Sequence, residues 1–92
     1  MREVKNWTKL KVQVLTAVYW RDADAMDGWS STDAIASAEV PTFITYGLLM
    51  RIDDNVVVVA GTAPVKDTET PDMRRFNDVS VIPAECVERI EQ

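Results

Sequence analysis

The chain has 92 residues, of which 47% are apolar and 27% charged, and its formal net charge is −5. This length suits a single domain spanning residues 1–92, and the composition excludes a disordered tail or a fibrous repeat. No apolar run approaches the roughly 20 residues that cross a bilayer, so we expect no membrane partner and a cytoplasmic location.

The residue types also narrow the chemistry. The chain has no histidine and one cysteine, which excludes Ser-His-Asp and Cys-His catalysis and the usual zinc sites. Cys86 has no histidine and no cationic residue directly beside it in the sequence, so we expect a buried structural thiol. A calcium loop is not complete at Asp22, Asp24 and Asp27, because the required glycine and glutamate are missing. Acid–base catalysis by a pair such as Asp22 and Asp78 would require the fold to bring the two carboxylates together. We expect no catalytic residue, no metal and no cofactor.

The first half of the chain predicts a long strand and a short helix. Apolar residues alternate from Leu10 to Trp20, which is typical of a half-buried strand over residues 8–21. Leu15, Ala17 and Tyr19 make its second face apolar as well. Residues 22–29 predict a loop, and the N-cap oxygens and alanines that follow predict a helix over residues 31–39, before Pro41.

The second half predicts four more strands. Residues 42–52 and 56–62 form a β-hairpin about Asp53-Asp54-Asn55, and residues 63–72 form a loop. A fourth strand over 75–82, a single tight turn over 83–85 and a closing strand over 86–90 complete the chain. The fold class is therefore mainly β with one short helix. We expect a five-stranded antiparallel SH3-like or Sm-like small barrel, with the helix inserted between strands 1 and 2.

Six short segments carry a resemblance to known proteins, and the resemblance as a whole extends over most of the chain after Lys9. They are Trp20-Arg21-Asp22-Ala23, Trp29, Thr45-Tyr46-Gly47, Asp53-Asp54, Val59-Ala60-Gly61-Thr62 and Val81-Ile82-Pro83-Ala84-Glu85-Cys86-Val87. Together they resemble small, largely uncharacterised proteins encoded by bacteriophages and prophages. The resemblance implies a small barrel and a phage source and brings no established active site. By analogy with other small phage proteins, we expect a non-enzymatic anti-defence sponge that sequesters a small nucleotide-derived immune signal as a homo-oligomer.

Aromatic, glycine and arginine residues suggest where such a ligand would bind. Trp20 and Trp29 flank the acidic loop and are candidates for stacking a base, although large aromatics are more often core or interface anchors. Gly47 and Gly61 face each other across the hairpin and either leave a clearing or permit a strand bend. The predicted anion site joins that clearing to residues that suit phosphate: Thr45, Arg51, Thr62, Arg74 and Arg75. Alternatively, these arginines balance Asp53, Asp72 and Asp78 on a solvated face.

Two other functions stay open. A protein-interaction module that inhibits a host protein directly would use an exposed sheet edge. The stretch 22–50, with five acidic and no basic residues, would steer it to a basic partner. An Sm-like nucleic-acid binder would use Lys5, Lys9, Lys11 and Arg21, but the acidic balance makes nucleic acid the weaker prediction. For the nucleotide-sequestering sponge we expect self-assembly into a homo-oligomer, because a small core leaves apolar residues on both strand faces.

Overall fold

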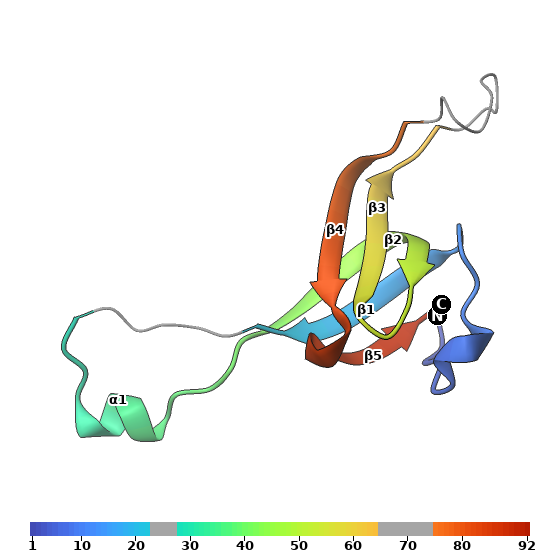
Figure 1. Ribbon diagram of the computed structural model, residues 1–92. Helices are drawn as coiled ribbons and strands as arrows, with labels where there is room; N and C mark the ends of the chain where they lie inside the picture. The colour runs from blue at the N-terminus through green and yellow to red at the C-terminus, as the bar shows by residue number, and fades with distance from the viewer. Residues whose placement is uncertain (23–27, 65–74) are drawn as a thin grey trace.

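The computed structural model describes residues 1–22, 28–64 and 75–92. Five antiparallel strands form one sheet in the order β4-β3-β2-β1-β5 (Figure 1). The elements are η1 (Trp7–Lys9), β1 (Leu15–Arg21), α1 (Thr32–Ala36), β2 (Thr42–Ile52), β3 (Val56–Thr62), β4 (Asn77–Pro83), η3 (Ala84–Cys86) and β5 (Val87–Glu91). The mainly β class and the helix between the first two strands are confirmed. The sheet is open, since β4 and β5 stand at opposite edges, so the predicted closure into a barrel is not confirmed.

The sheet coils so that one face surrounds a single apolar cluster. Each cluster side chain is at most 3% exposed: Val18, Leu49, Val57, Val59, Ile82 and Ile90. Trp7, Leu10, Trp20, Ile52 and Val87 pack against it. This inner face takes alternate residues of each strand, as the period of 2 requires. Within the described ranges, no helix is long and apolar enough to cross a membrane.

The first strand is shorter than predicted. Residues 8–21 were expected to be one strand, but β1 begins at Leu15, and a 3₁₀ turn capped by Asn6 precedes it. The physical reason lies at Gln13, whose φ of +57° leaves the extended region while its amide donates to the Leu49 carbonyl at 2.6 Å. The chain therefore turns before β1, and Val12 lies 56% exposed.

The two chain ends lie side by side (Figure 1). Arg2 and Gln92 exchange backbone hydrogen bonds of 3.1 and 3.0 Å, and Glu3 bridges to Glu91, so the N-terminal residues pair with β5. The Gln92 side chain donates to the Lys11 carbonyl at 2.7 Å and to the Thr16 hydroxyl at 3.0 Å. These bonds connect the irregular first segment to the sheet.

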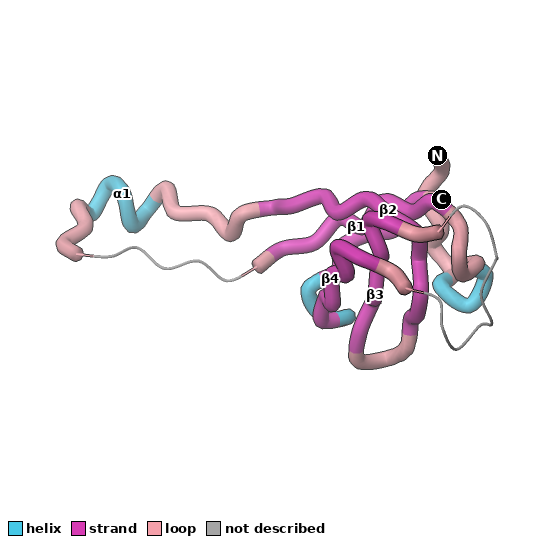
Figure 2. The backbone as a smooth tube through the Cα atoms, turned by 90° about the horizontal axis from the view of Figure 1, so that it is seen from above, coloured by secondary structure: helices cyan, strands magenta, loops and turns pink. Residues whose placement is uncertain are grey.

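The β1–β2 ribbon leads to an arm, defined here as residues 28–41, that projects away from the core (Figure 2). Ser31 caps α1 by accepting from the Ala34 amide at 3.1 Å, as the sequence predicted. The helix ends at Ala36 instead of residue 39, and Ser37 forms its C-cap, with its hydroxyl donating to the Asp33 carbonyl at 3.0 Å. The helix does not cover the core cluster. The arm contributes to the 58 Å length of a molecule only 29 by 22 Å across.

The remaining bounds shift by one or two residues from the prediction. The fourth strand starts at Asn77 instead of residue 75 and extends to Pro83. The tight turn and the last strand each start one residue later than predicted, at Ala84 and Val87. The predicted loop over residues 63–72 lies mostly outside the described residues.

Candidate functional site

Trp20 and Thr45 meet at the base of the arm. The Trp20 indole N–H donates to the Thr45 hydroxyl at 2.9 Å, and its ring packs on Phe43 with the centroids 4.9 Å apart. Phe43 is the direct cross-strand partner of Trp20, a geometry in which aromatic pairs stabilise antiparallel strands. Both the polar and the aromatic groups of Trp20 therefore have partners within the chain.

Trp29 lies apart from that pair. Its side chain is fully exposed on the arm, at 105% of the reference value, while Trp20 is half-buried against the core. The structure does not bring the two indoles together as a stacking pair.

Gly47 permits close backbone packing and does not leave a clearing. A Cβ at Gly47 would lie 2.6 Å from Val59 Cγ1 and 2.9 Å from the Ala60 carbonyl carbon, with the Ala60 oxygen closer still. The space that the sequence suggested for a ligand is filled by β3. At Gly61 an added Cβ would lie 3.1 Å from Asp78 Cβ. Close packing against β3 therefore accounts for the glycine at position 47, and the strand bend suggested for these glycines stays a prediction.

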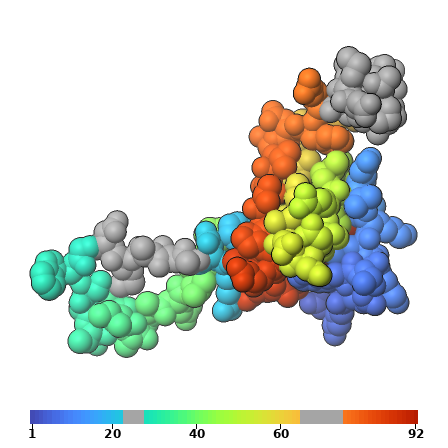
Figure 3. All heavy atoms as spheres, in the orientation of Figure 1, coloured from blue at the N-terminus to red at the C-terminus, as the bar shows by residue number. Residues whose placement is uncertain are grey.

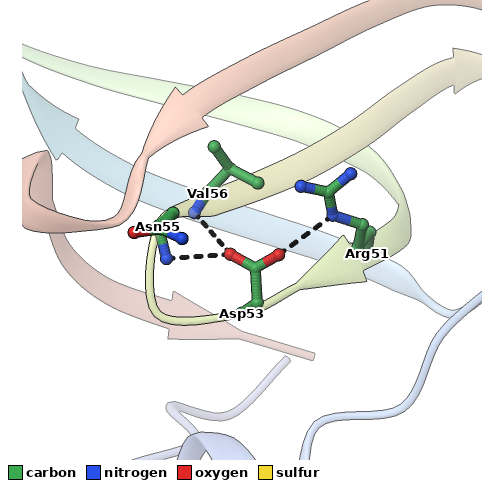
Figure 4. A network of polar contacts seen from close by, with 4 residues as sticks. All are labelled: Arg51, Asp53, Asn55 and Val56. Atoms are coloured by element: carbon green, nitrogen blue, oxygen red, sulfur yellow. Dashed lines mark hydrogen bonds and ion pairs between the residues drawn. The ribbon is translucent and has the colours of Figure 1, made fainter.

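Arg51 is bound into the β2–β3 turn (Figure 4). Its Nε lies 3.1 Å from Asp53 Oδ2, and the other Asp53 oxygen accepts from the amides of Asn55 at 2.8 Å and Val56 at 2.9 Å. Those two amides, with the Arg51 charge beside them, lower the pKa of Asp53 from its ordinary value. Arg51 thus neutralises a neighbouring carboxylate, which is the alternative to phosphate binding that the sequence left open.

The other residues of the predicted anion site do not converge on Arg51. Thr62 donates to Asp78 at 3.0 Å and so faces a carboxylate. Arg51 pairs with Val58, four residues from Thr62 along β3, which separates their backbones by roughly 13 Å. Arg75 is exposed just before β4. Arg74 lies outside the described residues, as do Asp24, Asp27 and Asp72 of the sequence argument.

The structure also describes residues considered for metal binding, thiol chemistry and acid–base catalysis. Among them, no group of three or more His, Cys, Asp or Glu side chains could hold a metal ion. Cys86 is half-buried, less buried than the sequence suggested. Asp22 follows β1 and Asp78 lies on β4, and β2 and β3 separate these strands. Three interstrand spacings amount to about 14 Å along the sheet, too far for two carboxylates to share a proton.

The face of the sheet opposite the core is apolar across four strands. Strand register aligns Val79, Ala60, Leu48 and Leu15 in one cross-strand row, from β4 through β3 and β2 to β1. Direct cross-strand neighbours have Cβ atoms about 5 Å apart, so this row is continuous. We call this side the outer face and define it by its apolar residues Leu15, Ala17, Tyr19, Ile44, Tyr46, Leu48, Val58, Ala60, Val79 and Val81. Arg51 also lies on this face, as the cross-strand partner of Val58 near the β2–β3 turn.

The outer face has buried small residues and exposed large ones. Ala17 and Ala60 are each 1% exposed yet do not belong to the core cluster, so neighbouring outer-face side chains cover them. The large residues protrude into solvent, with exposed fractions between 47% and 63%: Leu15, Ile44, Tyr46, Val79 and Val81. Together they present roughly 500 Å² of apolar surface, which is in the range where the largest patch on a protein is often functional.

Charged side chains border the outer face along β5. The Arg89 guanidinium lies 3.9 Å from the centre of the Tyr19 ring, and Arg21 pairs with Glu88. A hydrogen bond to Glu91 is the main cause that raises the pKa of Tyr19, while Arg89 opposes it. An apolar centre with a charged border is typical of a protein-binding surface.

A shallow hollow of about 320 Å³ lies at another end of the sheet, and the sequence gave no sign of it. Its walls are Trp7, Thr8, Leu10, Ile52, Asp53 and Asp54. The 3₁₀ turn brings Trp7 to the hairpin turn, a contact between residues 45 positions apart or more that no local pattern reveals.

Comparisons with known proteins give no match: no family model, no curated protein and no solved structure corresponds to this chain. The outer face and the arm are therefore the features of this chain that indicate a function.

Proposed function

We propose that this chain is a non-enzymatic binding protein and that the outer face is its protein-interaction surface. The observation that carries the proposal is the row Val79, Ala60, Leu48 and Leu15, which is apolar over four strands and ends in exposed side chains. Burial of such a surface is the main driving force for protein association. Among the functions that the sequence left open, this is the protein-interaction module, with the sheet face as its contact instead of the sheet edge.

A protein ligand suits the outer face better than a nucleotide does. A nucleotide site needs a few polar groups that fix the orientation of base and phosphate. The row across this face is aliphatic, and Arg51, the arginine that lies on the face as the partner of Val58, is paired with Asp53. The residues chosen for phosphate recognition face carboxylates instead, Arg51 at Asp53 and Thr62 at Asp78. The phage source and the nucleotide-sequestering activity stay predictions from resemblance and analogy.

The strand order and the turn before the last strand also indicate the fold type. We propose that the sheet belongs to the SH3-like or Sm-like small-barrel type. Two features support this: the strand order β4-β3-β2-β1-β5, and the one-turn break η3 between the two edge strands. In such an arrangement the inner face holds the core, which leaves the outer face for contacts.

The test is site-specific photo-crosslinking in cells that express the protein. A benzophenone amino acid replaces Tyr46 on the outer face or, as a control, the exposed Glu85 of η3. We expect discrete protein adducts from position 46 and few from position 85. Equal adduct yields at the two positions would contradict the proposal.

A further inference from the structure

The arm exposes large apolar side chains that nothing in the described structure covers. Trp29, Ile35 and Val40 are 105%, 61% and 50% exposed, and α1 has no buried residue. A helix of five residues is not stable in water by itself, so a contact beyond those seen in the chain must stabilise it. Figure 3 shows this arm standing clear of the body of the molecule.

We propose that the arm of one copy docks on the outer face of a second copy, with the exchange made reciprocally about a twofold axis. This inference rests on the proposed function, because it names the partner of the outer face. Trp29 and Ile35 would lie over the row that contains Leu48 and Ala60, against the exposed side chains of Leu15 and Val79 at its two ends.

The apolar area available fits a stable dimer. Outer face and arm together offer on the order of 800 Å² of exposed apolar surface per copy, and standard interfaces bury about 800 Å² on each partner. A reciprocal exchange uses both surfaces of both copies and closes the assembly, so it does not grow into a filament.

Charge is a second argument for this pairing. The described arm carries Asp33 and Glu39 and no basic residue. The β5 border of the outer face carries both signs of charge, with Arg89 beside Glu91 and Glu3 and with Arg21 paired to Glu88, and the exposed Arg75 stands before β4. The two carboxylates of the arm have Arg75 and Arg89 as partners beside this face, and such pairing would fix the orientation of the arm more than its affinity.

The first experiment is sedimentation velocity of the full chain over a range of concentrations. We expect a dimer, and we expect Trp29→Ser with Ile35→Ser to raise the dimer dissociation constant at least tenfold. Val12→Ser is the matched control, because Val12 is 56% exposed and lies on neither surface. The arm residues make no buried contact, so far-UV circular dichroism should show the same sheet in all variants.

The second experiment tests the contact itself by disulfide formation between two variants, both in a Cys86→Ser background. One carries Ser30→Cys on the arm and the other Val81→Cys on the outer face, and a mixed disulfide should form on mild oxidation. The control replaces Val81→Cys with Glu85→Cys and should form far less.

The outcomes separate the two proposals. A monomer at all concentrations, or a mixed disulfide no more abundant than the control, overturns the arm exchange. A dimer that survives the arm substitutions also overturns it. In each case the photo-crosslinks at position 46 still decide whether the outer face binds a protein.

Discussion

Replacing Gly47 by alanine should cost far more stability than the same change at Gly61. The Cβ added at Gly47 would lie within 3 Å of Val59 Cγ1 and of the Ala60 carbonyl carbon. Because the Ala60 atoms belong to the backbone of β3, side-chain rotation cannot relieve the overlap, and the two strands must separate. Overpacking of this kind costs about 1–3 kcal/mol, and we expect the upper end, about 3 kcal/mol. For a chain of this size that lowers Tm by roughly 10–20 °C.

The matched control is Gly61→Ala. Its added Cβ would meet Asp78 Cβ at 3.1 Å and the Asp78 carbonyl at 3.5 Å, so a small adjustment of one exposed residue is enough. We expect a loss below about 1 kcal/mol. Urea unfolding followed by tryptophan fluorescence measures both variants. Equal losses would refute the close approach of β2 and β3 at Gly47.

The remaining predictions concern single contacts. Asp53→Asn should destabilise the turn near neutral pH. Because folding lowers the pKa of Asp53, the wild type is more stable than the variant above the unfolded-state pKa near 3.8, and it loses this advantage as the pH falls through the folded-state pKa. Urea unfolding of both proteins at several pH values would measure this loss. Thr16→Val should cost about 1–2 kcal/mol in urea unfolding, because the buried hydroxyl bonds the Val14 carbonyl and the Gln92 amide, and a loss near zero would speak against that network. Leu49→Ala should cost about 2–5 kcal/mol, since this side chain is fully buried at the centre of the core cluster; a cost below about 1 kcal/mol is incompatible with that position.

The elements of the fold were largely predictable because local patterns encode them. Residues 42–52 and 56–62 form β2 and β3 with the predicted bounds, since alternation and β-branched runs on either side of an Asp-Asp-Asn turn have few other solutions. The start of β1 was not predictable. Alternation continued back to Leu10, but Gln13 adopts a positive φ to bond with Leu49, a contact 36 residues away.

The ligand site was predicted less well than the fold, because it depends on contacts between residues that are distant in the sequence. The sequence placed Arg51 and Thr62 near one clearing, but the register puts them about four residues apart on β3, and each faces a carboxylate instead. The sequence shows that several carboxylates are close to these residues along the chain, but it does not show which carboxylate each of them contacts. Gly47 likewise showed a missing side chain without showing that the adjacent strand fills the space.

The sequence predicted a second apolar face, but only the structure shows which residues form it. Apolar residues on both faces of residues 15–19 and of the hairpin indicated a second contact surface. A register shift between Leu49 and Arg51 then decides which residues of β2 share a face with Val58 and Ala60. Such a bulge is set by packing and has no reliable sequence pattern, so the row across four strands could not be drawn beforehand.

Burial of the outer face against a protein can be measured by the photo-adduct yield at position 46 in two matched backgrounds. Val81→Glu places a charge on the outer face, and Val12→Glu places the same charge at a residue of similar exposure away from it. The account predicts that Val81→Glu lowers the yield at least tenfold while Val12→Glu leaves it unchanged. Equal yields in the two backgrounds would contradict it.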